Sequence, residues 1–183
     1  MNTILPNILS KVAIGLTLLL LVSINSASYA ETYKTNEAFL KEAFAGKVPA
    51  PKHIWLRDGL KKQVNDILMH PYGKLRVKYW MSANKSVWIL EEVGKEKPIT
   101  TGIIINKQGK VSKVEILAFR ESRGWEIKYP FFLKQFINAD LKTNQQLDKN
   151  VDGITGATLS VRAVTKLARM ALLLHHHQKK IGK

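Results

Sequence analysis

The chain has 183 residues, a length that predicts one folded domain. It contains no cysteine, which excludes disulfides, thiol redox chemistry, iron–sulfur clusters and thioether-linked haem. Its formal net charge of +15 favours an acidic partner or an anionic membrane surface. Nucleic acid is not the expected partner, because the lysines are scattered along the chain instead of clustering on one arginine-rich helix.

Residues 1–30 have the pattern of a secretory signal peptide. Lys11 gives a weakly basic start, residues 12–22 are an apolar run, and small residues precede a cleavage point after Ala30. The run is shorter than the about 20 residues that a membrane span needs, so we expect cleavage and a periplasmic location. The alternative is that the run is kept as a membrane anchor. Residues 31–183 are expected to form a single domain, which keeps 28 of the 29 basic residues and all 14 acidic ones, a net charge of +14.

Two amphipathic helices are predicted near the start of that domain. Residues 36–45 carry apolar side chains on one side, and Thr35 has the side chain of an N-cap. Residues 59–69 show a second apolar face at helical spacing. His53 and His70 flank this helix, but nothing pairs them at a metal-ligand spacing, so we expect surface or capping histidines.

Four strands are predicted in succession, over residues 74–82, 86–93, 99–105 and 111–119. The first strand alternates apolar and polar residues, as expected for a half-buried strand. The links are short, and residues 106–109 have the composition of a hairpin turn. Short links predict an antiparallel meander, and the lack of alternation between strands and helices excludes a Rossmann fold. The predicted fold class is therefore α+β, an antiparallel four-stranded meander flanked by helices.

The last part of the chain contains a short aromatic helix, a connector and a long helix. The short helix is expected over residues 130–137, the polar connector over 141–150, and an amphipathic helix over 159–174, whose apolar face belongs to the core. Residues 175–180 begin with three consecutive histidines that could bind a metal adventitiously. We favour a frayed and solvated helix end there, so no metal site is predicted.

The loop before the long helix has the composition of an anion-binding turn. Residues 152–160 read Asp-Gly-Ile-Thr-Gly-Ala-Thr-Leu-Ser, with two glycines that permit a tight turn. The helix that follows directs its free N–H groups and the positive end of its dipole at this loop. An anion near Thr158 is therefore expected to be stabilised without a lysine. The alternative is a polar loop that only caps the helix, with Thr158 or Ser160 as the N-cap.

The stretch Asp-x-x-Thr-Gly-Ala-Thr in this loop resembles the flavinylation motif of FMN-binding domains. Such domains occur in the sodium-translocating NADH:quinone reductase and in the related Rnf complex. In that family an FAD:protein FMN transferase moves FMN from FAD onto the hydroxyl of the last motif residue, as a phosphodiester. The resemblance implies covalent FMN on Thr158. Asp152, Thr155, Gly156 and Ala157 complete the motif, and we expect the cofactor site to include them together with Gly153 and Ser160 of the same loop and helix start.

A second match to the same family follows the fourth predicted strand. Glu121, Ser122 and Gly124 resemble its Glu-Thr-x-Gly segment, with serine in place of threonine. The family usually carries a histidine shortly before this glutamate and a proline before the glycine, and here Arg123 replaces the proline and the histidine is absent. Trp125 follows directly. The resemblance covers roughly residues 85–174.

Two side chains of this second segment leave alternatives open. Glu121 either takes part in the flavin site or forms a surface salt bridge with Arg120 or Arg123. Trp125 either stacks on the flavin ring or fills the core.

The sequence therefore predicts a periplasmic flavoprotein that carries electrons on covalent FMN. Its partners are expected to be the transferase and an acidic redox protein, such as a cytochrome or a membrane reductase, with proximity to a membrane surface as a further consequence of its charge. Asp152 is expected to shape the loop or to serve the transferase, because a carboxylate repels phosphate. We see no base–nucleophile pair, so an electron-transfer protein is favoured over an enzyme. The alternative is a non-redox module that binds a phosphate-bearing ligand or an anionic lipid head group.

Overall fold

Six antiparallel strands form one open sheet in the computed structural model of the protein, which describes residues 31–181. Their order across the sheet is β1-β6-β5-β4-β3-β2. The strands are β1 (Glu31–Thr32), β2 (Lys52–Trp55), β3 (Arg76–Ser82), β4 (Lys85–Val93), β5 (Pro98–Asn106) and β6 (Val111–Phe119). The helices are α2 (Asn36–Ala43), α3 (Asp58–Leu68), α4 (Pro130–Leu133) and α5 (Thr158–Ile181), with 3₁₀ turns η1 (Trp125–Lys128) and η2 (Lys134–Phe136). The predicted signal peptide, with its cleavage after Ala30, lies outside the described residues.

The predicted meander is confirmed, since β3 to β6 follow one another as antiparallel neighbours. The prediction of a four-stranded sheet is wrong, because β1 and β2 extend the sheet at its two edges. β1 has two residues and β2 has four, of which only Ile54 is buried, so neither strand produces an alternating pattern in the sequence. The α+β class is confirmed, with six strands and four helices between residues 31 and 181.

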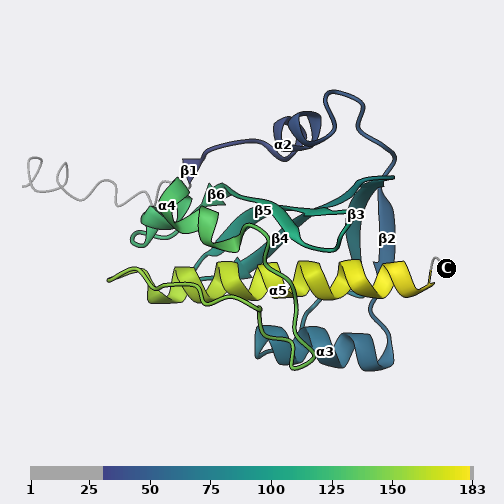
Figure 1. Cartoon of the computed structure of the whole chain (residues 1–183). Helices are drawn as coiled ribbons and strands as arrows, with labels where there is room; N and C mark the ends of the chain where they lie inside the picture. The colour runs from purple at the N-terminus through teal and green to yellow at the C-terminus, as the bar shows by residue number, and fades with distance from the viewer. Residues whose placement is uncertain (1–30, 182–183) are drawn as a thin grey trace, which may run out of the picture.

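The long helix α5 crosses one face of the sheet (Figure 1). It packs on β4 and β5, and α3 lies beside it. Leu167 and Ala171 of α5 and Val64 and Ile67 of α3 are fully buried between these elements. Burial of a large aliphatic side chain contributes about 1.5–3 kcal/mol, so this face holds the main core. None of the described helices combines the length and the apolar character needed to cross a membrane.

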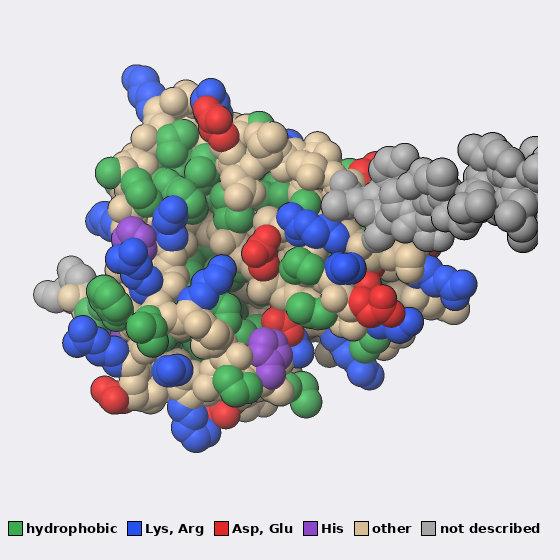
Figure 2. Space-filling model, turned by 180° about the vertical axis from the view of Figure 1, so that it is seen from behind, with side chains coloured by type: hydrophobic (Ala, Val, Ile, Leu, Met, Phe, Trp, Pro, Cys, Tyr) green, Lys and Arg blue, Asp and Glu red, His purple; other side chains and the backbone are tan. Residues whose placement is uncertain are grey.

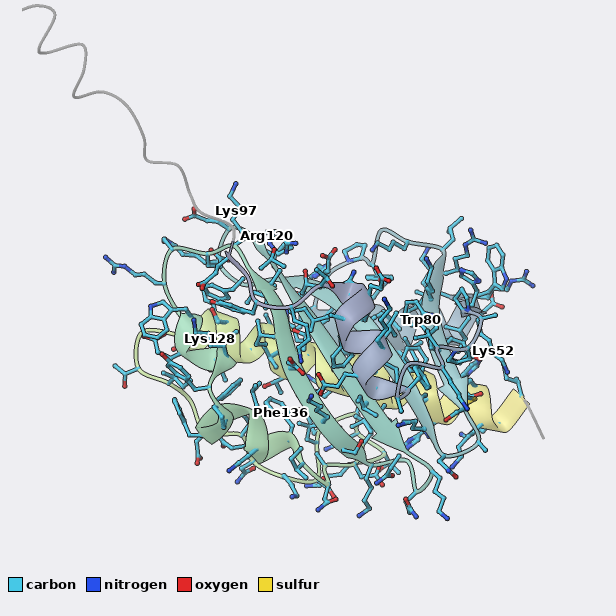
Figure 3. All side chains as sticks on the ribbon, turned by 90° about the horizontal axis from the view of Figure 1, so that it is seen from above. Lys52, Trp80, Lys97, Arg120, Lys128 and Phe136 are labelled. Carbon is cyan, nitrogen blue, oxygen red and sulfur yellow. The ribbon has the colours of Figure 1, made fainter. Side chains whose placement is uncertain are left out.

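The short helix α2 covers only part of the opposite face. Thr35 is its N-cap, as predicted, and accepts a hydrogen bond from the Ala38 N–H at 3.1 Å. Phe39 packs on Gly102 of β5, where an added Cβ would lie 2.5 Å from its ring carbons. Seen from above, α2 lies over the sheet, and Trp80 of β3 stands beside it (Figure 3). The part of this face formed by β2 and β3 has no covering helix among the described elements.

The C-terminal histidines belong to a well-packed helix, so the prediction of a frayed end is wrong. α5 is continuous to Ile181, and His175 is only 1% exposed. Its Nδ1 lies 2.7 Å from the hydroxyl of Ser86, which accepts a hydrogen bond from the Trp88 indole N–H at 2.8 Å. A histidine ring can be buried when one of its nitrogens is bonded, which a polarity pattern cannot show. The described residues contain no cluster of three or more potential metal ligands.

The other two histidines belong to different parts of the fold. His53 is exposed on the edge strand β2. His70 follows α3, and its Nε2 lies 3.0 Å from both carboxylate oxygens of the buried Glu92. Lys166 of α5 pairs with the same carboxylate at 3.1 Å. This ion-paired group links the end of α3 to β4 and α5 and is structural.

We expect His175 to make the protein less stable in acid. Burial, together with the positive charges of His176 and Lys179, lowers the pKa of His175 to about 4 from its ordinary 6.5. The stability that depends on neutral His175 is therefore fully present above a pH of about 6.5 and is lost as the pH falls through about 4. His175→Asn keeps a partner for Ser86 but cannot titrate. Between pH 7 and pH 4, urea unfolding of the wild type should lose on the order of 3 kcal/mol more than the variant. Equal losses would show that another group titrates.

Candidate functional site

The first turn of α5 carries the predicted acceptor hydroxyl. Thr158 is the first residue of the helix and is exposed. The Ala157 carbonyl accepts a hydrogen bond from the Val161 N–H at 2.9 Å, so Ala157 occupies the N-cap position. The prediction that Thr158 or Ser160 caps the helix is therefore wrong. The methyl group of Ala157 cannot accept a hydrogen bond, so the helix start has no side-chain cap from this position.

An alanine at the N-cap leaves the helix start open to an acceptor from outside. Among the described residues, no acceptor contacts the backbone N–H groups of Thr158, Leu159 and Ser160. Gly156 turns the chain before them with a φ of +82°, a left-handed conformation that glycine adopts without strain. The free N–H groups and the positive helix end together favour an anion next to Thr158.

A cleft of about 550 Å³ opens beside this helix start. It is lined by the loop after β6, the turn into α5 and the turn between β4 and β5. Its volume lies within the about 300–1,000 Å³ that is typical of small-molecule sites. The lining residues are Lys95, Glu121, Ser122, Arg123, Gly156, Ala157, Thr158, Leu159 and Ser160. The two segments that the sequence singled out therefore meet in one cleft, although more than thirty residues separate them.

Gly124 brings the loop after β6 against the first turn of α5. A Cβ at this position would lie 2.5 Å from the Ser160 hydroxyl and 3.4 Å from the Ala157 methyl, which leaves no room for a side chain. Gly124 also has a φ of +89°, in the left-handed region. Ser160 is only 4% exposed, so its role is to pack against this loop.

Glu121 holds the turn between β4 and β5 at the rim of the cleft. One of its carboxylate oxygens accepts hydrogen bonds from the backbone N–H groups of Lys95, Glu96 and Lys97 at 2.5, 2.8 and 2.9 Å. The predicted alternative of a salt bridge with Arg120 or Arg123 is wrong, because within the described residues Arg120 pairs with Glu91 and neither arginine pairs with Glu121. Glu121 is therefore a positioning residue, because backbone N–H groups stabilise its negative charge.

The side chains at the cleft favour an anionic ligand. Lys95 and Arg123 contribute two positive charges, and the carboxylate of Glu121 is turned to the backbone of the β4–β5 turn. The hydroxyl of Thr158 and the open helix start lie in the same lining. A phosphate group fits these donors, because Lys and Arg side chains and helix N-termini are its usual ligands.

Apart from Gly124, four predicted site residues lie outside the cleft lining. Asp152, Gly153 and Thr155 are exposed in the loop before Gly156. Asp152 holds this loop through its backbone N–H, which donates to the Gln135 side chain at 2.7 Å, and no partner of its carboxylate is found among the described residues.

Trp125 is the fourth predicted site residue outside the cleft lining. Its side chain is 42% exposed, so the interpretation that it fills the core is wrong. Its ring contacts the edge of Tyr129, with the ring centroids 5.6 Å apart. Stacking of Trp125 on a flavin stays a prediction, since its ring does not line the cleft in this arrangement.

Four lining residues were not among the site residues predicted from the sequence: Lys95, Ser122, Arg123 and Leu159. Ser122, Arg123 and Leu159 lie inside the two stretches that the sequence singled out, whereas Lys95 is brought to the cleft by contacts between segments that are distant in the chain. Gly94, the residue before Lys95, was the one local sign of a close approach between segments, since an added Cβ there would lie 2.9 Å from a Glu121 carboxylate oxygen.

Comparison with known families agrees with this geometry. The family model described as the FMN-binding domain matches residues 94–173, which begin at the β4–β5 turn and end within α5. The matched stretch contains all nine residues that line the cleft. The chain has no significant match among curated proteins. The resemblance stated for residues 85–174 is thus confirmed for residues 94–173.

We expect Glu121→Ala to destabilise the protein. The substitution leaves three backbone N–H groups without their acceptor, and a hydrogen bond to a charged group contributes about 1.5–3 kcal/mol. The free energy of unfolding, measured with urea, should fall by about 2 kcal/mol. The matched control is Glu96→Ala in the same turn, because Glu96 makes only an exposed pair with Lys95, worth about 0–1 kcal/mol. Equal effects of the two substitutions would refute the positioning role of Glu121.

Proposed function

Since residues 94–173 are an FMN-binding domain, we propose that the protein is an exported electron carrier with FMN joined covalently to Thr158. The observation that carries the proposal is the exposed Thr158 hydroxyl at an uncapped helix start, inside a cationic cleft. A phosphodiester at this position keeps one negative charge. Lys95, Arg123 and the free N–H groups of the first helical turn are the groups that would stabilise it.

The attachment needs a second protein, which we propose to be an FAD-dependent FMN transferase. The Thr158 oxygen forms a bond to the FMN phosphorus, the pyrophosphate bond of FAD breaks, AMP leaves, and the hydroxyl proton is released. Thr158 is exposed, so a transferase can reach it. The free carboxylate of Asp152 stands in the exposed loop six residues earlier, which favours a role in this encounter over phosphate binding.

The carrier role follows from what FMN supplies and from how the chain holds it. Bound FMN can accept and release electrons singly or in pairs, which lets a carrier connect different partners. The residues of the chain bind and orient the cofactor through the turn held by Glu121 and the loop seated by Gly124. The cleft is open to solvent, so a cofactor in it stays accessible to a partner.

A second candidate function uses the same cleft without redox chemistry. Lys95, Arg123 and the open helix start suit any phosphate-bearing ligand, including an anionic lipid head group. Colour separates the two functions. A flavoprotein is yellow and keeps its flavin after denaturation if the bond is covalent, whereas a binding module is colourless.

Thr158→Ala should abolish covalent flavin while the fold is retained. The protein is co-expressed with an FMN transferase, and its intact mass and its circular dichroism are measured. The wild type should carry one FMN, and the variant none, because the acceptor oxygen has been removed.

Two neighbouring hydroxyls provide the controls. Thr155 is exposed in the same loop, and Ser160 lies in the same helical turn but is buried against Gly124. Thr155→Ala and Ser160→Ala should both keep the FMN mass. Flavin retained on the Thr158→Ala protein would overturn the assignment of the acceptor.

We also propose a periplasmic location for the mature protein, with cleavage after Ala30. N-terminal sequencing of the fractionated protein should then find Glu31 in the soluble periplasmic fraction. Recovery of a chain that starts at Met1 from membrane fractions would show instead that the apolar run is kept as an anchor.

The electron partner is proposed to be an acidic redox protein, such as an acidic cytochrome or a membrane reductase. The proposal rests on the net charge of the mature protein, +14 from 28 basic and 14 acidic residues, which attracts acidic surfaces at long range and repels basic ones. The same charge would also bring the protein close to an anionic membrane surface.

A further inference from the structure

An open groove of about 380 Å³ lies on the sheet face that α2 leaves uncovered. Its walls come from β2, β3, β4 and the start of β5, with Asn36 of α2 at one end. Figure 2 shows this side of the molecule, where lysine and arginine side chains gather round hydrophobic ones. The groove belongs to neither the cleft nor the main core, and the proposed function does not use it.

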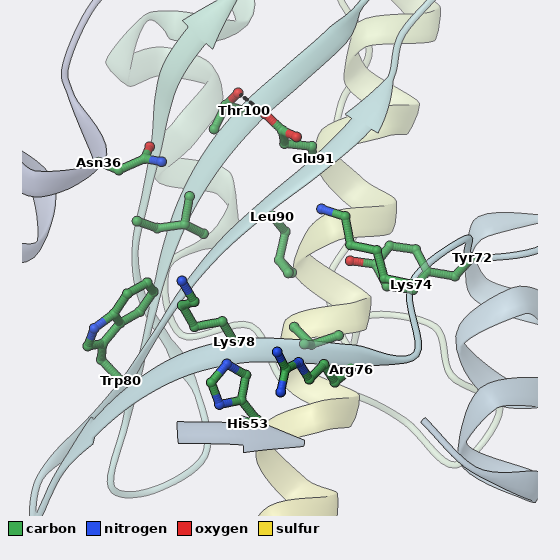
Figure 4. Close-up of a pocket in the computed structure, with 12 residues that line it drawn as sticks. Asn36, His53, Tyr72, Lys74, Arg76, Lys78, Trp80, Leu90, Glu91 and Thr100 are labelled. Atoms are coloured by element: carbon green, nitrogen blue, oxygen red, sulfur yellow. Dashed lines mark hydrogen bonds between the residues drawn. The ribbon is translucent and has the colours of Figure 1, made fainter. Parts of the chain in front are cut away.

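The alternation of β3 places a row of cations in this groove. Val77 and Tyr79 point into the core, so Arg76, Lys78 and Trp80 point to the opposite face, and Lys74 continues the row one step earlier. Such side chains are spaced by about 7 Å along a strand. The close-up shows the charged ends of Lys74 and Lys78 directed into the groove (Figure 4).

These cations have no carboxylate to neutralise them. Among the described residues, Lys74, Arg76 and Lys78 form no ion pair within 4.0 Å. His53 is the neighbour of Lys78 on the paired strand and lines the same groove. Like charges side by side on a sheet destabilise it, so an acidic partner would relieve this repulsion.

The one acidic side chain in the described groove lining is already paired. Glu91 accepts a hydrogen bond from the Thr100 hydroxyl at 2.8 Å, drawn as a dashed line in Figure 4, and lies 3.9 Å from Arg120. The groove therefore presents a net positive surface.

The composition of the groove suits a protein partner more than a small molecule. Trp80, Tyr72 and Arg76 belong to the three residue types that dominate binding energy at protein interfaces, and Ile89 gives an apolar centre. A small-molecule site encloses most of its ligand in a largely apolar cavity, whereas this groove is open along its length and rimmed by charges.

One end of the groove is next to the cleft that holds Thr158. Arg120 donates hydrogen bonds to the Pro98 carbonyl at 3.0 Å and to the Thr100 hydroxyl at 2.9 Å. Thr100 lines the groove, and Glu121, the residue after Arg120, lines the cleft. A protein bound over the groove therefore reaches the rim of the cleft.

We propose that this groove, with Lys74, Arg76, Lys78 and Trp80 as its main contacts, is the docking surface for the acidic redox partner. The inference rests on the proposed electron-carrier function and adds the place at which the partner binds. Carboxylates of the partner pair with the cation row, an apolar side chain packs on Trp80, and the redox centre of the partner comes to lie beside the cleft.

The test uses the soluble domain of cytochrome b5, an acidic haem protein, as the probe. It is titrated into ¹⁵N-labelled, flavinylated protein, and the amide and indole signals are followed by NMR. The expected result is shifts in residues 74–80, with the Trp80 indole among them. A charge-reversal variant (K74E, R76E and K78E) should abolish these shifts and slow electron transfer to the cytochrome at least about tenfold, the low end of electrostatic steering.

A second charge-reversal variant separates local docking from net charge. Lys107, Lys142 and Lys180 form no described ion pair, so K107E, K142E and K180E together change the net charge equally. This variant should keep the NMR shifts at residues 74–80. Its rate of electron transfer to the cytochrome should fall less than that of the first variant. Raising the salt from 0.1 to 1 M shortens the Debye length from about 10 Å to about 3 Å and should remove the rate difference between the two variants.

Three outcomes would overturn the proposal. Equal losses in both variants would leave only an effect of net charge. Shifts centred on the exposed Trp125, Tyr129 and Phe131 would place the docking surface there. If inorganic phosphate shifted the same signals and bound with an affinity equal to that of the cytochrome, the groove would be a site for small anions. Thr158→Ala protein should bind the cytochrome unchanged, so a failure of flavin attachment can be told apart from a failure of docking.

Discussion

The contact between Gly124 and Ser160 is the constraint on which the cleft depends. It needs a residue without a side chain, because any Cβ would overlap the serine hydroxyl. This contact joins the end of β6 to the first turn of α5. Glu121 then extends the connection to the β4–β5 turn through three backbone hydrogen bonds. The chain therefore assembles the cleft from its own contacts, and a ligand enters a preformed arrangement of donors.

The openness of the cleft bears on the proposed covalent attachment. A cofactor that is held without a covalent bond needs most of its surface buried to remain bound. A cofactor that is tied to Thr158 stays at a high effective concentration near its site, so weak contacts of its ring are sufficient. The cleft provides charges and backbone donors around the attachment point, and its lining contains no aromatic side chain among the described residues. On the proposed linkage, an exposed flavin is a consequence of this design, and exposure is what exchange with a partner requires.

Most of the fold could be predicted from the sequence, because local patterns determine it. The alternation in β3, the hairpin turn after β5 and the N-cap Thr35 all correspond to the structure. The predictions failed where a local pattern was too short or ambiguous. β1 has only two residues, and the burial of His175 depends on Ser86, which lies 89 residues earlier in the chain. The site was predictable only in part, for the same physical reason. The motif residues around Thr158 are contiguous, whereas the partners of Glu121 lie 24 to 26 residues earlier and become its neighbours only when β4, β5 and β6 are paired.

The sheet also explains why positively charged side chains gather on one face of β3. β3 must bury Val77 and Tyr79 under α5 and α3, and its alternation then places Arg76 and Lys78 on the other face. The helix α2 packs where that face is apolar, over β4, β5 and β6 with Trp80 of β3 at the border of the cluster, so its coverage ends before the charged side chains of β3. Arg120 connects the uncovered surface to the segment that lines the cleft. On the proposed docking, the positive charges of the cation row and of the cleft add together, and they would draw an acidic surface toward Thr158 before any short-range contact forms.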